Sequence, residues 1–439
     1  MDKNKIYTVN KEKYLFFEDD LEIIKFPDNV ENINDVFEEM TQEKNLLVTH
    51  SYYKLEKNKI GTDKNKVISI NLTNGCNLKC SYCFIEAFSG KMQLLTEKEL
   101  IQKLEFSNNN ISKNDRVALY FSGSGEPLMN FKLLKKIPAI CKKMGIKPSY
   151  YEINTNGTLI TDEIAIFFKE NNFVVNVSID AIEKQHNATR KYINGKDSYD
   201  DVFKGLSILL KHKLNVACKT VIVPESKTTF ETLRTYEKKK LPYVFDIATP
   251  SVEDYYVPQV KDLDVFNDEF KKTIDYLINK SKKGEKIYSL KIMNDLSKIH
   301  NRQIKQIGCN ACLGSFYIGQ DDNLYPCLYL SDSKEASVGS VEKGIDKDKI
   351  IRNNLYAKHV NDYNNCKTCH IKYLCGGGCF AIKYIENGNT DTVSEYLCKY
   401  YKIYWDNLIR MYIEIYPFIT DINNLNHIAY EQNNAISCN

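Results

Sequence analysis

The sequence has little excess charge, no long apolar run and no internal repeat. Its 60 lysines and arginines nearly balance 57 aspartates and glutamates, for a net charge of +3. That balance offers no electrostatic basis for binding nucleic acid or a membrane surface. The charged opening, MDKNKIYTVN, is followed by no apolar segment of signal-peptide or membrane-spanning length. These absences predict a cytoplasmic protein with no nucleic acid and no membrane among its partners.

Cysteine, in contrast, is abundant, with 14 residues in a chain of 439. A disulfide framework is disfavoured in a reducing cytoplasm, so metal ligation or catalysis is the better interpretation. Most of the cysteines fall into two groups, one near residue 80 and one between residues 309 and 398. The chain is long enough for two or three domains.

Six β-rich runs alternate with helical patterns in the middle of the chain. One helical pattern begins after Thr96, with Glu99 three residues on, which is a capping-box signature. Strands that alternate with helices predict βαβ units and a parallel sheet, in which ligands bind at the carboxyl ends of the strands. A six-stranded Rossmann-like sheet is the plain alternative, and the motifs below argue against it. The runs are VISINLT (67–73), RVALYFS (116–122), SYYEINTNG (149–157), NFVVNVSID (172–180), NVACKTVIV (215–223) and PYVFDIATP (242–250).

The flanks of this central region have other patterns. The residues before it contain three short strand patterns and an acidic helical one, NINDVFEEMTQE. Two helical patterns follow it, at 261–283 and 288–304, and the last forty residues are largely helical in pattern.

Three cysteines, Cys76, Cys80 and Cys83, come directly after the first β-rich run. Three thiolates do not complete a structural zinc site, which takes four ligands. A zinc ribbon would need a second CxxC within about twenty residues, and none is there. Three thiolates can hold three irons of a [4Fe–4S] cluster and leave the fourth iron open for another ligand.

This run, CNLKCSYC, resembles the CxxxCxΦC motif of the radical S-adenosylmethionine (radical SAM) enzymes, with Tyr82 in the aromatic place. The resemblance implies that the open iron binds the amino and carboxylate groups of S-adenosylmethionine. An electron from the cluster then breaks the sulfur–carbon bond, and the resulting 5′-deoxyadenosyl radical abstracts hydrogen from the substrate. The cofactor carries this chemistry, while the protein positions and shields it.

The second run leads into FSGSGEPL, which is similar to the GGEP motif of the same family. Ser124 stands where the first Gly is usual, and Gly125, Glu126 and Pro127 match. In the family the backbone and the acid of this motif hold the methionine amino group. A simple tight turn is the alternative interpretation of the four residues.

The ends of the third and fourth runs extend the resemblance. The third, INTNGTLI, contains Asn154 and is similar to a segment that lines the cofactor pocket. In the fourth, VSIDAIEKQHNATR, Ser178 and Arg190 match positions that hold the cofactor carboxylate and ribose. Arg190 could instead form a surface salt bridge. Asp180 also matches a family position, without a definite role.

Eight further cysteines lie between residues 309 and 398. The segment CKTCHIKYLCGGGC, spaced C-x2-C-x5-C-x3-C, resembles a SPASM domain, the C-terminal extension of peptide-modifying radical SAM enzymes. Two zinc sites, or clusters that act only as structural staples, are the alternatives. The resemblance implies two auxiliary [4Fe–4S] clusters, cluster I on Cys309, Cys312, Cys327 and Cys379 and cluster II on Cys366, Cys369, Cys375 and Cys398. The position of Cys309 is variable in the family, and without it cluster I has an open iron that could bind a substrate thiolate.

Two positions depart from the family pattern. In DDNLYPC, Asp322 stands where Gly is usual, which bears on the geometry of that turn. Sulfatase-maturing relatives carry an Asp as catalytic base after YPC, and here Leu328 takes that place, which argues against formylglycine formation. Cys141 and Cys218 are expected to be small core residues. His370 is expected to pack or bond locally rather than to bind metal.

The resemblance implies an α/β fold: a partial (β/α)6 radical SAM barrel with a C-terminal SPASM iron–sulfur domain and a small N-terminal α+β module. That module resembles a truncated peptide-binding winged helix, which would add a leader peptide to a sheet edge; a plain cap on the barrel is the alternative. The expected divisions are residues 1–64 for the N-terminal peptide-binding-like module or cap, 65–255 for the barrel, 256–305 for a helical linker, 306–400 for the SPASM domain and 401–439 for a helical tail.

Together these features predict a maturase that uses S-adenosylmethionine and three [4Fe–4S] clusters to install a crosslink in a ribosomally made precursor peptide. A thioether from a Cys sulfur to carbon is the first expectation. Carbon–carbon or carbon–oxygen crosslinking, epimerisation, decarboxylative cleavage, sulfatase-maturase-like oxidation and a small-molecule substrate are alternatives. A non-catalytic iron–sulfur scaffold is disfavoured, because a carrier needs no open iron and no cofactor pocket. The expected partners are the precursor peptide and a flavodoxin- or ferredoxin-type electron donor.

Overall fold

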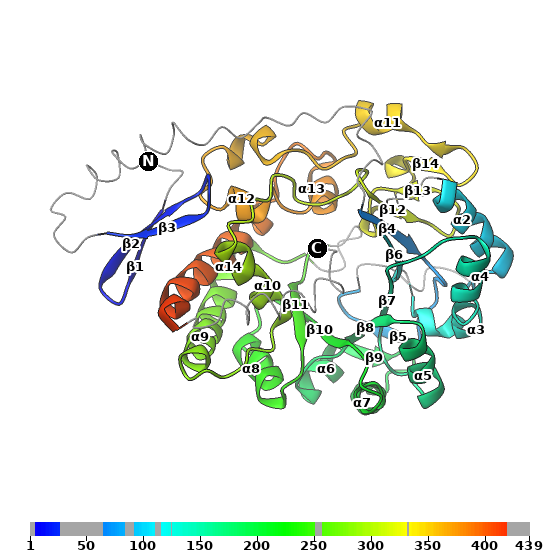
Figure 1. The fold of residues 1–439 in the computed structure, drawn as a ribbon, viewed down its shortest axis with the longest axis horizontal. Helices are drawn as coiled ribbons and strands as arrows, with labels where there is room; N and C mark the ends of the chain where they lie inside the picture. The colour runs from blue at the N-terminus through cyan, green and yellow to red at the C-terminus, as the bar shows by residue number, and fades with distance from the viewer. Residues whose placement is uncertain are drawn as a thin grey trace.

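The centre of the molecule is one eight-stranded sheet with the order β11–β10–β8–β7–β6–β4–β12–β13 (Figure 1). The computed structural model describes residues 5–26, 65–83, 92–109, 116–123, 125–250, 257–331 and 333–418. Six strands pair in parallel and follow one another in chain order, so all six β-rich runs of the sequence are confirmed as strands. They are β4 (Asn65–Ile70), β6 (Arg116–Phe121), β7 (Tyr150–Thr155), β8 (Phe173–Ser178), β10 (Val216–Ile222) and β11 (Tyr243–Ile247).

Helices connect these strands and lie along the outside of the curved sheet (Figure 1). The capping box is present, because the backbone N–H of Thr96 donates to the Glu99 carboxylate at 2.7 Å and the N–H of Glu99 donates back to Thr96 Oγ1 at 3.3 Å. The segment 131–143 forms two helices rather than one, because Pro138 near the start of the second lacks the N–H that would continue the first. The connecting helices are α2 (Glu97–Asn109), α3 (Phe131–Leu134), α4 (Ile137–Lys143), α5 (Asp162–Glu170), α6 (Glu183–Thr189), α7 (Tyr199–Lys211) and α8 (Thr229–Lys239).

Three longer helices follow the last parallel strand. They are α9 (Leu263–Lys282), α10 (Leu290–His300) and α14 (Glu395–Ile415), as the helical patterns of the sequence predicted. Helices α9 and α14 pack against each other and against the outer face of β11, where the Phe245 ring lies 6.0 Å from Phe270 and 6.2 Å from Tyr404. No helix within the described ranges is both long and apolar enough to cross a bilayer.

Side chains alternate between the two faces of each parallel strand. The outer positions, such as Tyr243, Phe245 and Ile247 on β11, are apolar and buried under helices. Several of the inner positions are polar, which is unusual for a parallel sheet that only has to support a core. This polar inner wall consists of Tyr120, Glu152, Asn154, Asn176, Ser178, Lys219 and Asp246.

The cysteine-rich segment joins the same sheet. Its hairpin of β12 (Ser315–Ile318) and β13 (Leu324–Tyr325) continues the sheet beyond β4, because β12 pairs in parallel with β4. In the hairpin turn, Asp322 has the positive φ of 61° that glycine adopts readily, and its carboxylate pairs with Lys103 of α2. The other elements of the segment are short: β14 (Gly339–Ser340), β15 (Gly344–Ile345), α11 (Lys347–Arg352), α12 (Lys372–Cys375) and α13 (Phe380–Asn387). Helix α14 runs on across residue 400, and the division of the chain into domains stays a prediction.

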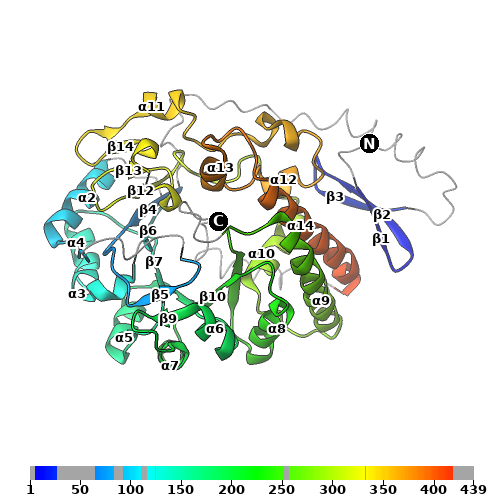
Figure 2. The ribbon, with the colours of Figure 1, turned by 180° about the vertical axis from the view of Figure 1, so that it is seen from behind.

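The N-terminal strands β1 (Lys5–Val9), β2 (Glu12–Phe17) and β3 (Glu22–Lys25) form a separate antiparallel sheet (Figure 2). This sheet lies against α14 and α12, far from it in the sequence: Tyr7 donates to Asp406 at 2.6 Å, and Glu18 pairs with Lys372 at 2.8 Å. The acidic helix expected over 32–43 lies outside the described residues.

Candidate functional site

The loop after β4 carries the first three cysteines. It leads into β5 (Leu78–Cys80), which pairs with β9 (Arg190–Tyr192) so that Cys80 stands opposite Arg190. Burial raises the pKa of the Cys76 thiol to about 12, and the nearby Glu126, Cys80 and Cys83 act in the same direction. Neighbouring thiolates repel one another. A bound cationic metal centre offsets this repulsion, so such thiols are suited to ligate one.

The Gly125–Pro127 turn packs directly on this cysteine loop. Gly125 has a φ of 117°, and a Cβ there would lie 2.4 Å from the Gly75 carbonyl oxygen, so only glycine fits. The N–H of Glu126 donates to the same oxygen at 2.8 Å. Pro127 then opens a short 3-10 helix, Pro127–Asn130. Ser124 lies outside the described residues.

The Glu126 carboxylate is buried and ties β6 to β7. It accepts hydrogen bonds from the N–H of Asn156 and the Thr155 hydroxyl, both at 2.7 Å, and from the N–H of Leu128 at 3.0 Å. Burial raises its pKa to about 7, against the opposing effect of these donors. The acid therefore holds the turn in shape through internal bonds, and the turn's backbone is presented beside the cysteine loop.

Two asparagines at the end of β7 face the same region. Asn154 donates to Tyr120 and Ser122, while its buried Oδ1 has no hydrogen-bond partner among the described residues. Such an acceptor fits a donor group of a bound ligand. Asn156 donates to Asn77 at 2.8 Å and lies 3.7 Å from Cys76 Sγ. The sequence reasoning missed Asn156, although it stands in the same INTNG strand end.

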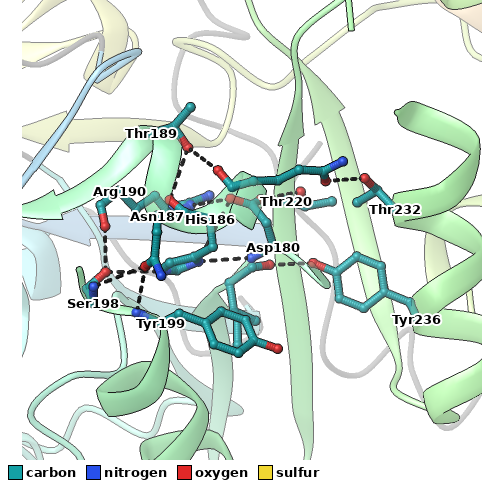
Figure 3. A network of polar contacts seen from close by, with 12 residues as sticks. Asp180, His186, Asn187, Thr189, Arg190, Ser198, Tyr199, Thr220, Thr232 and Tyr236 are labelled. Atoms are coloured by element: carbon teal, nitrogen blue, oxygen red, sulfur yellow. Dashed lines mark hydrogen bonds and ion pairs between the residues drawn. The ribbon is translucent and has the colours of Figure 1, made fainter. Parts of the chain in front are cut away.

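Arg190 belongs to a buried polar network (Figure 3). It is 5% exposed, its Nε donates to Asp180 at 3.1 Å, and its guanidinium lies 5.2 Å from the centre of the Tyr82 ring. The Thr220 hydroxyl donates to the other oxygen of Asp180 at 2.5 Å. The ion pair is therefore internal rather than a surface salt bridge. Arg190, which is opposite Cys80 on the paired strand, also contacts the Tyr82 ring.

His186 belongs to the same network and joins Asp180 to Ser198 (Figure 3). Its Nδ1 accepts from the N–H of Asp180 at 3.2 Å, and its Nε2 lies 3.0 Å from the Ser198 hydroxyl, which donates to the Arg190 carbonyl at 2.5 Å. These roles require a neutral ring with its proton on Nε2. Burial, with the positive charge of Arg190, lowers the pKa of His186 to about 4 and keeps the ring neutral.

The eight later cysteines fall into two groups whose thiols act on one another electrostatically, and their roles as cluster ligands stay a prediction. Apart from the burial that raises every one of their pKa values, the thiols of Cys309, Cys312, Cys327 and Cys379 act on one another, and so do those of Cys366, Cys369, Cys375 and Cys398. All the described cysteines are free thiols. The Cys309 thiol acts on those of Cys312, Cys327 and Cys379, and its role as a ligand of cluster I stays a prediction.

These thiols do not form a site for a single metal ion. In the described ranges, no three His, Cys, Asp or Glu side chains gather closely enough to ligate one metal ion. A four-iron cluster is several atoms across and holds its thiolates farther apart, with one thiolate for each iron. His370 is placed outside the thiol sets and bonds to Asp406 at 2.8 Å, as expected of a local contact. Cys141 and Cys218 are each 1% exposed in the core, also as expected.

The polar inner wall adds charged groups that the sequence reasoning did not single out. The Asp246 carboxylate forms ion pairs with two ammonium groups, that of Lys219 at 3.6 Å and that of Lys291 at 3.7 Å. Lys219 is in register with Ser178, a predicted cofactor contact on the neighbouring strand β8. The charged groups therefore lie on the polar inner wall next to that predicted contact. The signal available in the sequence was the polar residues at alternate positions in the second half of several strands.

Comparison with known proteins agrees with this arrangement. The family model of the Radical SAM superfamily matches residues 70–237. A cysteine-type anaerobic sulfatase-maturating enzyme of Clostridium novyi (strain NT) is 27% identical, over 77% of this chain and 93% of its own. The radical SAM cyclopropyl synthase TigE of Paramaledivibacter caminithermalis is 25% identical, over 88% of this chain and 84% of its own.

Two solved structures share the fold. Native anSMEcpe with bound AdoMet and Cp18Cys peptide superposes with a TM-score of 0.66 at 22% identity, over 82% of this chain and 99% of that one. Streptococcus suis SuiB bound to its precursor peptide SuiA superposes with a TM-score of 0.53 at 15% identity, over 90% of this chain and 98% of that one.

Proposed function

We propose that this chain, whose residues 70–237 are a radical SAM domain, is a maturase that crosslinks a ribosomally made precursor peptide. The observation that carries the proposal is where the cysteines lie: three at a strand end, and eight in the segment that extends the same sheet, which would form two quartets. Three thiolates leave an iron of one cluster open, and two quartets complete two more.

The residues at the strand ends would hold the cofactor. Cys76, Cys80 and Cys83 would ligate the first cluster, which, with bound S-adenosylmethionine, supplies a 5′-deoxyadenosyl radical. The backbone of the Gly125 turn lies against the cysteine loop and would receive the methionine amino group. Asn154, with its unpartnered buried Oδ1, would accept from the bound cofactor, as Ser178 and Arg190 would contact its carboxylate and ribose. Tyr82 would support Arg190 through its ring.

The substrate class rests on the auxiliary quartets and the relatives. Two more clusters allow an electron to be removed after a hydrogen atom, and the net two-electron oxidation forms a new bond. A peptide is bound in the two solved structures described above, and the N-terminal sheet could add a peptide strand at an edge. We therefore place the thioether of a peptide Cys first and a carbon–carbon or carbon–oxygen crosslink second.

A sulfatase-type oxidation is the second candidate, favoured by the 27% identity to a sulfatase-maturating enzyme over most of both chains. Leu328 after Cys327 weighs against it, because a leucine cannot accept the proton that this oxidation releases. If this reaction does occur, an inner-wall carboxylate such as Asp246 would have to take the proton.

The test is mass spectrometry of short peptides encoded beside the gene, each co-expressed anaerobically with the enzyme. A loss of two hydrogens per modification, with the peptide Cys blocked to alkylation, is the expected result. Loss of two hydrogens with a free thiol would move the assignment to a carbon–carbon or carbon–oxygen crosslink. A product trapped by a hydrazide would identify an aldehyde and hence the sulfatase-type reaction. An unchanged mass with uptake of deuterium from deuterated water would identify epimerisation, and no change of any kind would overturn the peptide assignment.

A further inference from the structure

A buried lysine lies between the two cysteine quartets. Lys383, on α13, is 2% exposed. Its ammonium sits 3.5 Å from the centre of the Tyr363 ring and 3.8 Å from where a Cβ on Gly377 would be. Gly377 is the middle residue of the turn that joins Cys375 of one quartet to Cys379 of the other.

Burial lowers the pKa of the Lys383 ammonium, and the nearby thiols act in the opposite direction. They come from both quartets: Cys309 and Cys379 from the first, and Cys366, Cys375 and Cys398 from the second. Across the described residues, no carboxylate lies within 4.0 Å of Lys383 Nζ and no acceptor takes a hydrogen bond from it. A buried ammonium without a counter-ion is strongly destabilising. Its charge is therefore compensated only when the cysteines, or a cluster bound by them, are negative.

A second lysine lies beside the same glycine turn. Lys305 Cδ is 3.0 Å from where a Cβ on Gly376 would be, and this lysine acts on Cys375 of one quartet and Cys309 of the other. Its surroundings differ from those of Lys383, because the Lys298 cation and the Asp295 carboxylate also act on it. The cation beside the first cysteine loop differs, because Arg190 is paired with the carboxylate of Asp180.

We propose that Lys383, with a smaller contribution from Lys305, is a shared counter-ion of both auxiliary clusters that raises their reduction potentials. The inference rests on the two auxiliary clusters of the proposed function. Each cluster gains one negative charge when it takes up one electron, and a positive charge held nearby in a poorly solvated region favours that reduced form. An auxiliary cluster poised in this way is a better acceptor for an electron leaving the substrate.

The test is a redox titration of the reconstituted full-length enzyme, with dithionite as the reductant and the clusters followed by electron paramagnetic resonance. In Lys383→Met, both auxiliary midpoints should move to more negative potential, so that the ratio of reduced to oxidised cluster at a fixed potential falls about tenfold. Lys383→Arg should retain the wild-type midpoints. Lys367→Met is the matched control, because this exposed lysine adjoins Cys366 and is screened by water, so its midpoints should not move.

Iron content separates the possible failures. About twelve irons per chain with unmoved auxiliary midpoints in Lys383→Met would overturn this inference and leave the proposed function intact. About four irons per chain in the wild type would overturn the proposed function together with it. If Lys383→Met fails to assemble its clusters, Lys305→Met carries the test: a smaller negative shift of both midpoints supports the inference, and no shift overturns it.

Discussion

Glu126 shows how one buried side chain joins two of the strand ends that form the site. It accepts three hydrogen bonds from β7 and from the turn after β6 while it is 2% exposed. Replacing it by Ala leaves those donors unpaired, so we expect Glu126→Ala to lose about 3 kcal/mol of stability. It should also bind S-adenosylmethionine at least about tenfold more weakly, because the turn relaxes.

Glu126→Gln is the matched variant for this prediction, since its amide oxygen can still accept from Thr155 and Leu128. We expect a loss of stability intermediate between the wild type and Glu126→Ala. Thermal unfolding and equilibrium dialysis with labelled cofactor measure the two effects. Equal behaviour of the Ala variant and the wild type would show that the turn does not depend on this carboxylate.

His186 makes the stability of the network depend on pH. The unfolded chain binds the proton near pH 6.5, whereas the folded chain binds it only near pH 4, because burial lowers the pKa of the ring. The unfolded state therefore holds more protons between these values, so stability is full above pH 6.5 and falls as the pH drops. Between pH 7.5 and 5.5 the expected loss is about 1 kcal/mol.

The unfolding temperature of the anaerobic enzyme across this pH range is the measurement. His186→Gln has no ring to protonate, so its unfolding temperature should fall less than that of the wild type over the same interval. Parallel decreases in the two proteins would show that His186 does not cause the pH dependence.

At the scale of elements, the N-terminal sheet is held to the cysteine-rich segment by a buried ion pair. Glu18 and Lys372 are 0% and 4% exposed and lie 2.8 Å apart, and Lys372 is part of the short helix that ends at Cys375. Lys372→Met leaves the Glu18 carboxylate buried beside an apolar chain, so we expect a loss of about 3 kcal/mol.

The double variant Glu18→Leu/Lys372→Met should recover part of that loss, because neither charge then remains buried. Lys25→Met is the control on the same sheet, since its pair with Glu12 is exposed and is worth less than about 1 kcal/mol. Hydrogen exchange of β1–β3 reports directly on docking. Unchanged exchange in Lys372→Met would mean that other contacts hold the sheet in place.

At the scale of the whole molecule, the two cysteine regions predict a division of labour. Cys76→Ala should abolish the formation of 5′-deoxyadenosine, because the loop then lacks a ligand for the cluster that binds the cofactor. Cys327→Ala and Cys375→Ala each break one auxiliary quartet, so they should retain some cofactor cleavage but lose the modified peptide. Cys141→Ala, a core cysteine outside all three sets, should retain both.

Chromatography of 5′-deoxyadenosine and mass spectrometry of the peptide measure the two activities separately. Iron content and unfolding temperature show whether each variant is folded. If folded variants of Cys327 or Cys375 lost cofactor cleavage as completely as Cys76→Ala, the clusters would not have separate roles.

The sequence by itself determined the local features. The six parallel strands follow from apolar runs of strand length between turn residues, and the start of α2 follows from the Thr96 and Glu99 pair. The first cysteine motif and the glycine turn are also local features, because the spacing of their residues can be read directly from the sequence. Each of these depends on residues within a few positions of one another, so no knowledge of packing is needed.

The tertiary structure decided what lies next to what. It added β12 to the edge of β4, placed Asn156 beside Cys76, paired Arg190 with Asp180, and brought Lys383 between the two quartets. The grouping of the eight later cysteines was expected only from a family resemblance, and packing is what brings Cys327 near Cys379. These contacts join residues far apart in the chain, and their partners are selected by burial of apolar surface and by the pairing of buried charges, neither of which a local pattern contains.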